Sequence, residues 1–222
     1  MKLKKYIKKF TFQNIYLLGA ICDAVLLFSV LAYLTTTSVF IKYVNETIAL
    51  SMFESRNEQL VEIFKIITYF GETKIIALLV LMTLPFLWKK NKKPEIFTLL
   101  TAVGGSGVLI YIFKHIMKAP RPEFSTIIET SYSFPSGHST ITIAFYGLLI
   151  WYFFIRGNTN LKNVMKAIVT TAVALLIPLS RLILGVHYFF DIIGGIILGT
   201  VCLLTGIVIF RFVEGYLRVK HN

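Results

Sequence analysis

The sequence predicts an all-α integral membrane protein, a single bundle of six transmembrane helices formed by residues 1–222. Hydrophobic residues make up 56% of the chain and charged residues only 15%, against roughly 25% charged residues in soluble domains. The apolar residues gather in runs that reach or approach the roughly 20 residues that a membrane-spanning helix needs. The charged residues are concentrated between these runs, as expected for the connections of a helical bundle.

The net charge of +12 is high enough to suggest nucleic acid binding, but its distribution indicates a membrane protein. Lysines cluster at the chain ends and in short connections between apolar runs, which is the pattern of cytoplasmic loops. No nucleic acid partner is therefore expected. Cys22 and Cys202 both lie in apolar runs without neighbouring ligands, so neither a disulfide nor a metal site is predicted.

The first half of the chain contains two predicted spans separated by a long connection. Residues 1–14 form a basic segment, expected in the cytoplasm, with five lysines among the first ten residues. The apolar run at about 15–41 is too long for a cleaved signal peptide and is the first span. Residues 42–72 mix charges with amphipathic stretches, which predicts an outer connection along the interface. A short second span follows at about 73–88.

The second half contains four further apolar runs. The predicted spans are, in order, about 95–117, 138–155, 166–185 and 187–210. Gly194, Gly195 and Gly199 in the last span favour close helix packing, either within the chain or between protomers. The oligomeric state therefore stays open.

The basic connections predict the orientation of the bundle. Residues 89–93 and 156–166 are rich in Lys and Arg, as are both termini, so this side is expected in the cytoplasm of a multi-pass plasma-membrane protein. Residues 42–72, 114–138 and 180–187 then face outward. The last two segments also carry basic residues, against the rule, which indicates that these residues have a separate role.

Three polar clusters occur at predicted helix ends on the outer face. Ionisable residues are costly at membrane depth and usually mark a functional site. The clusters are Lys114, Arg121 and Pro122; Pro135, Ser136, Gly137 and His138; and Ser180, Arg181, His187 and Asp191. Because all three lie at the same face, we expect them to meet in one site.

The residue types in these clusters predict a phosphate-binding site. Arg121 and Arg181 offer planar pairs of donors that match phosphate oxygens, and Lys114 adds a point charge. Ser136 stands where a helix N-cap is expected, and Gly137 lets the backbone of that helix N-terminus approach an anion.

The two histidines predict catalysis. His187 and Asp191 are four residues apart and share one helical face, so the carboxylate can orient the imidazole. His187 is the candidate nucleophile, which gives a phosphohistidine, and His138 is the candidate acid and base. Ser180 is a further candidate phosphate contact, although it can also bond back to its own helix. No metal ligand set is evident, so no metal or other cofactor is expected.

These clusters and their spacings resemble the signatures of the type 2 phosphatidic acid phosphatase superfamily. Every motif position matches over residues 114–191, which is the predicted catalytic region. The resemblance implies a six-helix fold, a metal-independent phosphohistidine mechanism and a lipid phosphate or diphosphate substrate. The chain looks most like the compact bacterial enzymes acting on phosphatidylglycerophosphate or undecaprenyl diphosphate, and phosphatidic acid is a third candidate substrate.

Two other function classes use the same residues differently. A lipid-phosphate transporter would use the basic pocket to carry a headgroup, but the polar positions crowd into residues 114–191 without a counterpart in the first half. A binding protein would not need the second histidine. The expected partners are the bilayer and the lipid substrate, with no obligatory protein partner. Residues 123–134 are a candidate lid or headgroup selector.

Overall fold

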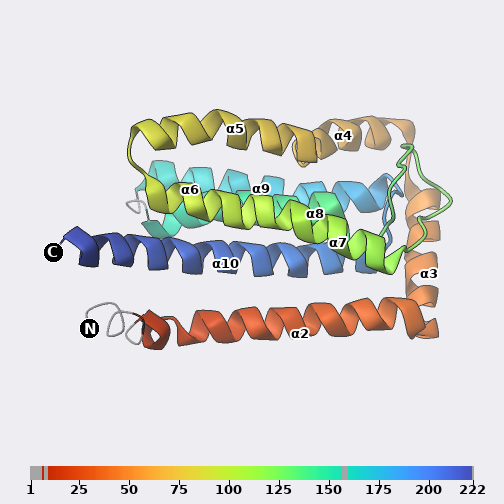
Figure 1. Cartoon of the computed structure of the whole chain (residues 1–222). Coiled ribbons are helices and arrows are strands. Elements are labelled where there is room, and N and C mark those ends of the chain that lie inside the picture. Colours follow the sequence, from red (N-terminus) through yellow and green to blue (C-terminus); the bar gives the residue numbers. More distant parts are fainter. Residues whose placement is uncertain (1–6, 8–9, 157–159, 222) are drawn as a thin grey trace.

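The computed structural model is a bundle of long helices with one further helix lying across one end (Figure 1). It describes residue 7 and residues 10–156 and 160–221. Much of the predicted basic N-terminal segment, residues 1–6 and 8–9, lies outside the described residues. The elements of the described part are helical, without strands, which confirms the all-α prediction.

The helices follow one another with short connections, apart from one long connection before α8. They are α2 (Ile15–Thr37), α3 (Val39–Ser55), α4 (Glu58–Tyr69), α5 (Thr73–Lys89), α6 (Lys93–Leu99), the π-helical η1 (Leu100–Gly104), α7 (Gly105–Met117), α8 (Gly137–Ile150), the π-helical η2 (Trp151–Arg156), α9 (Leu161–Ile183) and α10 (Phe189–His221). The elements α6, η1 and α7 run on without a break, as do α8 and η2.

Five candidate membrane spans, judged by length and composition, occur among the described residues. They are α2, α4 with α5, the helix from α6 to α7, α9 and α10. The second candidate runs from Glu58 to Lys89, so it overlaps part of the connection predicted at 42–72. The span expected at 138–155 corresponds to α8 and η2, which are not among the five.

Gly71 lies between α4 and α5 and allows this break in the helix to pack closely against α8 and α9. A Cβ atom at this position would lie 2.3 Å from Cγ2 of Ile177 in α9 and 2.9 Å from Oγ1 of Thr142 in α8. Real Cβ atoms are not found at such distances, so only glycine allows the break to touch both helices. The amphipathic stretch 58–69 is thus the helix α4, which packs on the bundle through this break.

The helix α3 lies across the end of the bundle (Figure 1). Its Asn45 side chain accepts a hydrogen bond of 3.1 Å from the Phe190 backbone N–H at the start of α10. At its other end, Arg56 donates to the carbonyls of Ile183 and Phe124. The helix α3 therefore fixes the connection between α7 and α8 and the one between α9 and α10.

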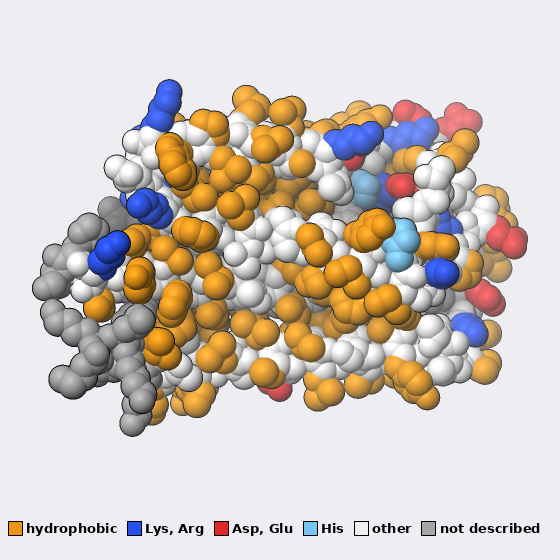
Figure 2. Space-filling view, in the orientation of Figure 1, with side chains coloured by type: hydrophobic (Ala, Val, Ile, Leu, Met, Phe, Trp, Pro, Cys, Tyr) orange, Lys and Arg blue, Asp and Glu red, His pale blue; other side chains and the backbone are white. Residues whose placement is uncertain are grey.

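The surface has a hydrophobic belt between two charged ends, as a membrane protein requires. Hydrophobic side chains cover the middle of the bundle in Figure 2, and charged side chains gather at its two ends. Leu26, Met82 and Leu175 are more than 60% exposed, which in water would be unfavourable over so wide an area. Both termini lie at the end opposite α3 (Figure 1).

The helix α10 is the central element and packs against α8, α2, α6 and η1. A Cβ atom at Gly195 would lie 2.6 Å from the Ser136 carbonyl oxygen, and one at Gly199 would lie 2.5 Å from that of Thr140. These glycines therefore pack α10 against α8 within the chain, which answers the alternative that the sequence left open. The close approach brings the N-terminus of α8 to the first turns of α10.

Candidate active site

The three polar clusters meet at the end of the bundle that α3 covers. Lys114 lies in the last turn of α7, and Arg181 lies in the last turn of α9. The second cluster is joined to the third directly, because the Ser136 backbone N–H donates to the Asp191 carbonyl at 3.0 Å. The predicted convergence of the clusters is thus present in the structure.

His187 is buried in the connection between α9 and α10, with one ring nitrogen facing a carboxylate. Its Nδ1 lies 3.5 Å from Oδ2 of Asp191 and 3.3 Å from the hydroxyl of Ser133. The Ser133 hydroxyl and the Tyr188 backbone N–H both donate to that carboxylate oxygen. Asp191 is therefore held by two donors, and Ser133 contacts both members of the predicted pair.

The other ring nitrogen of His187 faces the cations. Its Nε2 lies 3.4 Å from Nη1 of Arg121. Burial lowers the pKa of His187 well below the ordinary value, and the positive charges of Arg121, Arg181 and Lys114 lower it further. A neutral imidazole with its proton on Nδ1, toward Asp191, has its lone pair on Nε2, where it faces the Arg121 guanidinium. That is the state a nucleophile requires.

Arg181 is almost completely buried, with 2% of its surface exposed. Its Nη1 donates to Oγ1 of Thr68 in α4 at 2.9 Å, and its Nη2 donates to the carboxylate of Glu129. The Nε atom is buried without a hydrogen-bond partner. Because buried donors are normally satisfied, this nitrogen is a ready donor for an incoming anion.

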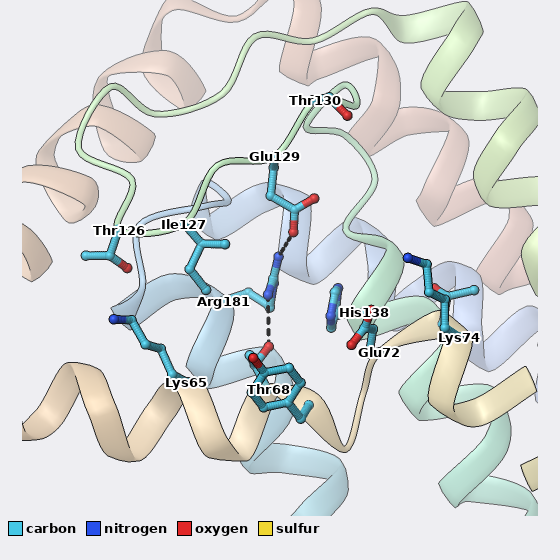
Figure 3. A pocket seen from close by; sticks show the side chains of 12 residues that line it. Lys65, Thr68, Glu72, Lys74, Thr126, Ile127, Glu129, Thr130, His138 and Arg181 are labelled. Carbon is cyan, nitrogen blue, oxygen red and sulfur yellow. Dashed lines mark hydrogen bonds and ion pairs between the residues drawn. The ribbon is translucent and has the colours of Figure 1, made fainter. Parts of the chain in front are cut away.

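A pocket of about 660 Å³ opens beside Arg181 and His138. Figure 3 shows both side chains in it, with Glu129 above Arg181 and Thr68 below. Residues of α4 and α5 and of the connection between α7 and α8 form its walls. His187 is not among the residues that line this pocket, and only 2% of its surface is exposed.

Lys114 and the N-terminus of α8 lie side by side. Lys114 donates to the Tyr132 carbonyl and lies 3.3 Å from the Ser131 hydroxyl. A Cβ atom at Gly137, the first residue of α8, would lie 4.0 Å from Cε of Lys114. Ser136 is the N-cap, and its hydroxyl oxygen accepts from the Ser139 N–H at 3.4 Å, as predicted.

Ser180 takes a different place from the other predicted residues. Its hydroxyl donates to the Ile177 carbonyl at 2.6 Å and is fully buried. This is the bond back to its own helix that the sequence allowed. A contact between Ser180 and phosphate stays a prediction.

Three residues of the site were not predicted as site residues, although Glu129 and Ser133 lie in the candidate lid at 123–134. Thr68 and Glu129 bind Arg181 from a helix and a connection without any recognised motif. Ser133 stands two positions before Pro135, so its closeness to a recognised cluster is the one local sign of its role.

Lys114, Arg121 and Arg181 are the predicted cations of the site, and Lys65 and Lys74 also line the pocket. In the part of the chain that the structure describes, no group of three or more His, Cys, Asp or Glu side chains is arranged to hold a metal ion. The arrangement can therefore bind a phosphate group through guanidinium and ammonium donors with two histidines at hand.

A model of a known family covers this region. The model described as the PAP2 superfamily matches residues 95–214, more than half of the chain and all three polar clusters. The chain belongs to the PAP2 superfamily. The resemblance stated from the motifs is thus confirmed.

One relative and two solved structures match the PAP2 chain. Phosphatidylglycerophosphatase B of Bacillus subtilis (strain 168) is 27% identical over 194 residues, covering 86% of this chain and 91% of that protein. The crystal structure of a transmembrane PAP2-type phosphatidylglycerolphosphate phosphatase from Bacillus subtilis superposes with a TM-score of 0.74 at 27% identity. The match covers 87% of this chain and 96% of that one. The crystal structure of Aquifex aeolicus LpxE shares the fold, with a TM-score of 0.57 at 21% identity. That match covers 73% of this chain and 94% of LpxE. The PAP2 family and the two Bacillus subtilis matches indicate a membrane phosphatase.

Proposed function

We propose that this PAP2 protein is a plasma-membrane phosphatase that hydrolyses the terminal phosphate or diphosphate of a lipid through a phosphohistidine on His187. The observation that carries the proposal is the orientation of this imidazole. Its Nδ1 faces Asp191, and its Nε2 faces Arg121 at 3.4 Å. Phosphatidylglycerophosphate is the first candidate substrate because a relative is named for it. Undecaprenyl diphosphate and phosphatidic acid are the other two.

The first step transfers the phosphoryl group to the enzyme. Lys114, Arg121 and Arg181 bind the phosphate oxygens, together with the backbone amide of Gly137 at the start of α8. The Nε2 lone pair of His187 attacks phosphorus, and the bond to the lipid oxygen breaks. His138 gives that leaving oxygen a proton, and Asp191 stabilises the charge on the substituted imidazole.

The second step releases phosphate. A water molecule gives a proton to His138 and attacks phosphorus, and the bond to Nε2 breaks. Inorganic phosphate leaves, and His187 returns to its neutral form. Because fixed cations already face the transferred phosphoryl group, we expect the reaction to proceed without a divalent metal ion.

The proposed topology has six spans, with both termini in the cytoplasm and the site at the outer face. We add the helix from Gly137 to Arg156 to the five candidates, which makes six spans. Its elements α8 and η2 are continuous, and roughly 20 residues suffice to cross the bilayer. The start of α2 and the end of α10 lie at the same end of the bundle (Figure 1), as expected for an even number of crossings. The basic turn at 89–93 favours the cytoplasm for that end.

Histidine variants test the mechanism. Phosphate release is measured for wild-type protein, His187→Ala and His138→Ala in detergent with the three candidate lipids. The wild-type protein should release phosphate with or without a chelator, and each variant should lose at least about 100-fold in kcat. Near-wild-type release by either variant would contradict the mechanism. Release from none of the lipids by wild-type protein would favour transport or binding in the same basic pocket.

A further inference from the structure

The side chain of Glu129 occupies the space between the two arginines of the candidate site. One carboxylate oxygen accepts a hydrogen bond from Nη2 of Arg181. The other lies 3.6 Å from Nη2 of Arg121. A carboxylate bridging two guanidinium groups uses the same donors that a phosphate would use. The resting site therefore already contains an anion supplied by the chain itself.

Both arginines also have hydrogen-bond partners other than Glu129. Arg181 is also held by Thr68, through a hydrogen bond of 2.9 Å. Arg121 donates to the carbonyls of Val186 at 2.6 Å and Ser131 at 2.7 Å. If Glu129 leaves, both guanidinium groups therefore keep partners on the scaffold, and their remaining donors become available.

Glu129 is also placed so that it can leave. Its side chain is 26% exposed, whereas that of Arg181 is 2% exposed. It belongs to the connection between α7 and α8, where Ile128 and Thr130 on either side are exposed. Rotation of its side chain toward the pocket mouth would expose a carboxylate that water solvates well, so the exchange does not require a change in the helices.

We propose that Glu129 is an internal competitor for the phosphate site, which the substrate phosphate displaces before it can reach His187. The inference rests on the proposed function and adds a residue to it. A site with several cations in a bilayer is surrounded by phosphodiester headgroups, each with a single negative charge. A terminal phosphate monoester carries about −1.5 to −2 charges at pH 7 and binds the arginines more strongly.

An internal competitor weakens the binding of every anion by a common factor. The weaker ligands, phosphodiester headgroups, then no longer fill the site at their high concentration in the membrane, while a terminal phosphate still does. The same factor promotes release of inorganic phosphate after each turnover. Glu129 thereby keeps the site free for its substrate without contacting the lipid.

The test compares Glu129→Gln with wild-type protein and with Glu123→Gln, an exposed glutamate of the same connection. Binding of inorganic phosphate and of dimethyl phosphate is measured directly by calorimetry in detergent, without turnover. Glu129→Gln keeps the shape and removes the charge, so both ligands should bind roughly tenfold more tightly or better, by the same factor. Glu123→Gln should bind both ligands as wild-type protein does.

The opposite result has a clear meaning. Unchanged or weaker phosphate binding in Glu129→Gln and in Glu129→Ala, with an unfolding temperature close to wild type, would show that the carboxylate supports the arginines and would overturn the inference. Because binding is measured without a lipid, the two proposals fail separately. Tighter phosphate binding without any lipid hydrolysis would contradict the proposed function alone, and lipid hydrolysis without tighter binding would contradict this inference alone.

Discussion

The pKa of His187 links the geometry around its ring to the pH range in which it can act. Burial is the main cause of the lowered pKa, and Arg121 is the largest of the charges that add to it. A nearby cation disfavours a second positive charge, so it keeps the imidazole neutral at lower pH. The arginines therefore serve the nucleophile as well as the phosphate.

The variant Arg121→Gln should move the acid limb of the pH profile. Removing this charge raises the pKa of His187 toward its ordinary value, so the imidazole is protonated at a higher pH than in wild-type protein. The acid limb of kcat/KM should then shift to higher pH, and the maximum of kcat/KM should fall because a phosphate ligand is lost. A histidine NMR titration of the free protein checks the same shift without substrate.

Lys92→Gln is the matched control, because it removes one positive charge at the opposite end of the bundle. Its acid limb should coincide with that of wild-type protein. An acid limb that stays in place in Arg121→Gln would mean that burial alone sets the pKa of His187.

At the scale of the elements, the connection between α9 and α10 is shaped by its contact with the one between α7 and α8. The Thr126 backbone N–H and hydroxyl both donate to the Leu184 carbonyl. Gly185 follows with φ of +70°, a conformation that other residues adopt at a cost. A Cβ atom there would lie 2.6 Å from the Phe124 carbonyl oxygen and 2.9 Å from Nη1 of Arg56.

The variant Gly185→Ala should weaken the contact between the α7–α8 connection and the α9–α10 connection. The positive φ alone costs about 1–2 kcal/mol for alanine, and the contact with the Phe124 carbonyl adds to it. Thermal unfolding in detergent should show a lower midpoint, and phosphate release should fall because Val186 and His187 follow directly. The control is Gly104→Ala, where a Cβ atom would meet nothing within 4 Å. Equal stability of the two variants would contradict this account of the connection.

At the scale of the whole molecule, the two ends of the bundle differ in what they carry. The candidate site and α3 lie at one end, and the termini lie at the other with the turn between α5 and α6 (Figure 1). The lysines of that turn favour the cytoplasm. The orientation determines which leaflet supplies the lipid, so it decides what the enzyme can meet.

Cysteine labelling tests the orientation. In a variant with Cys22→Ala and Cys202→Ala, single cysteines are placed by Ile128→Cys, where the native side chain is 96% exposed, or by Lys92→Cys. An impermeant maleimide added to intact cells should label position 128 and not position 92, and permeabilised cells should show both. The reverse pattern would place the site in the cytoplasm.

The sequence by itself determined the class of the protein and the positions of its motifs. Apolar runs separated by lysines predict membrane helices, because the bilayer imposes that composition on each segment locally. The clusters at Lys114 to Arg121, Ser136 to His138 and Arg181 to Asp191 were recognisable because their spacing is short. The N-cap role of Ser136 is likewise local, and the structure confirms it.

Only the tertiary structure decided which residues complete the site. Thr68 and Arg181 are 113 positions apart, and Glu129 and Arg181 are 52 apart, so no local pattern connects them. The packing of the break between α4 and α5 depends on Gly71 fitting against α8 and α9. Such contacts arise from how helices pack, and a single sequence does not encode them in any short repeat or spacing. The carboxylate of Glu129 between two arginines became visible for that reason only in the folded chain.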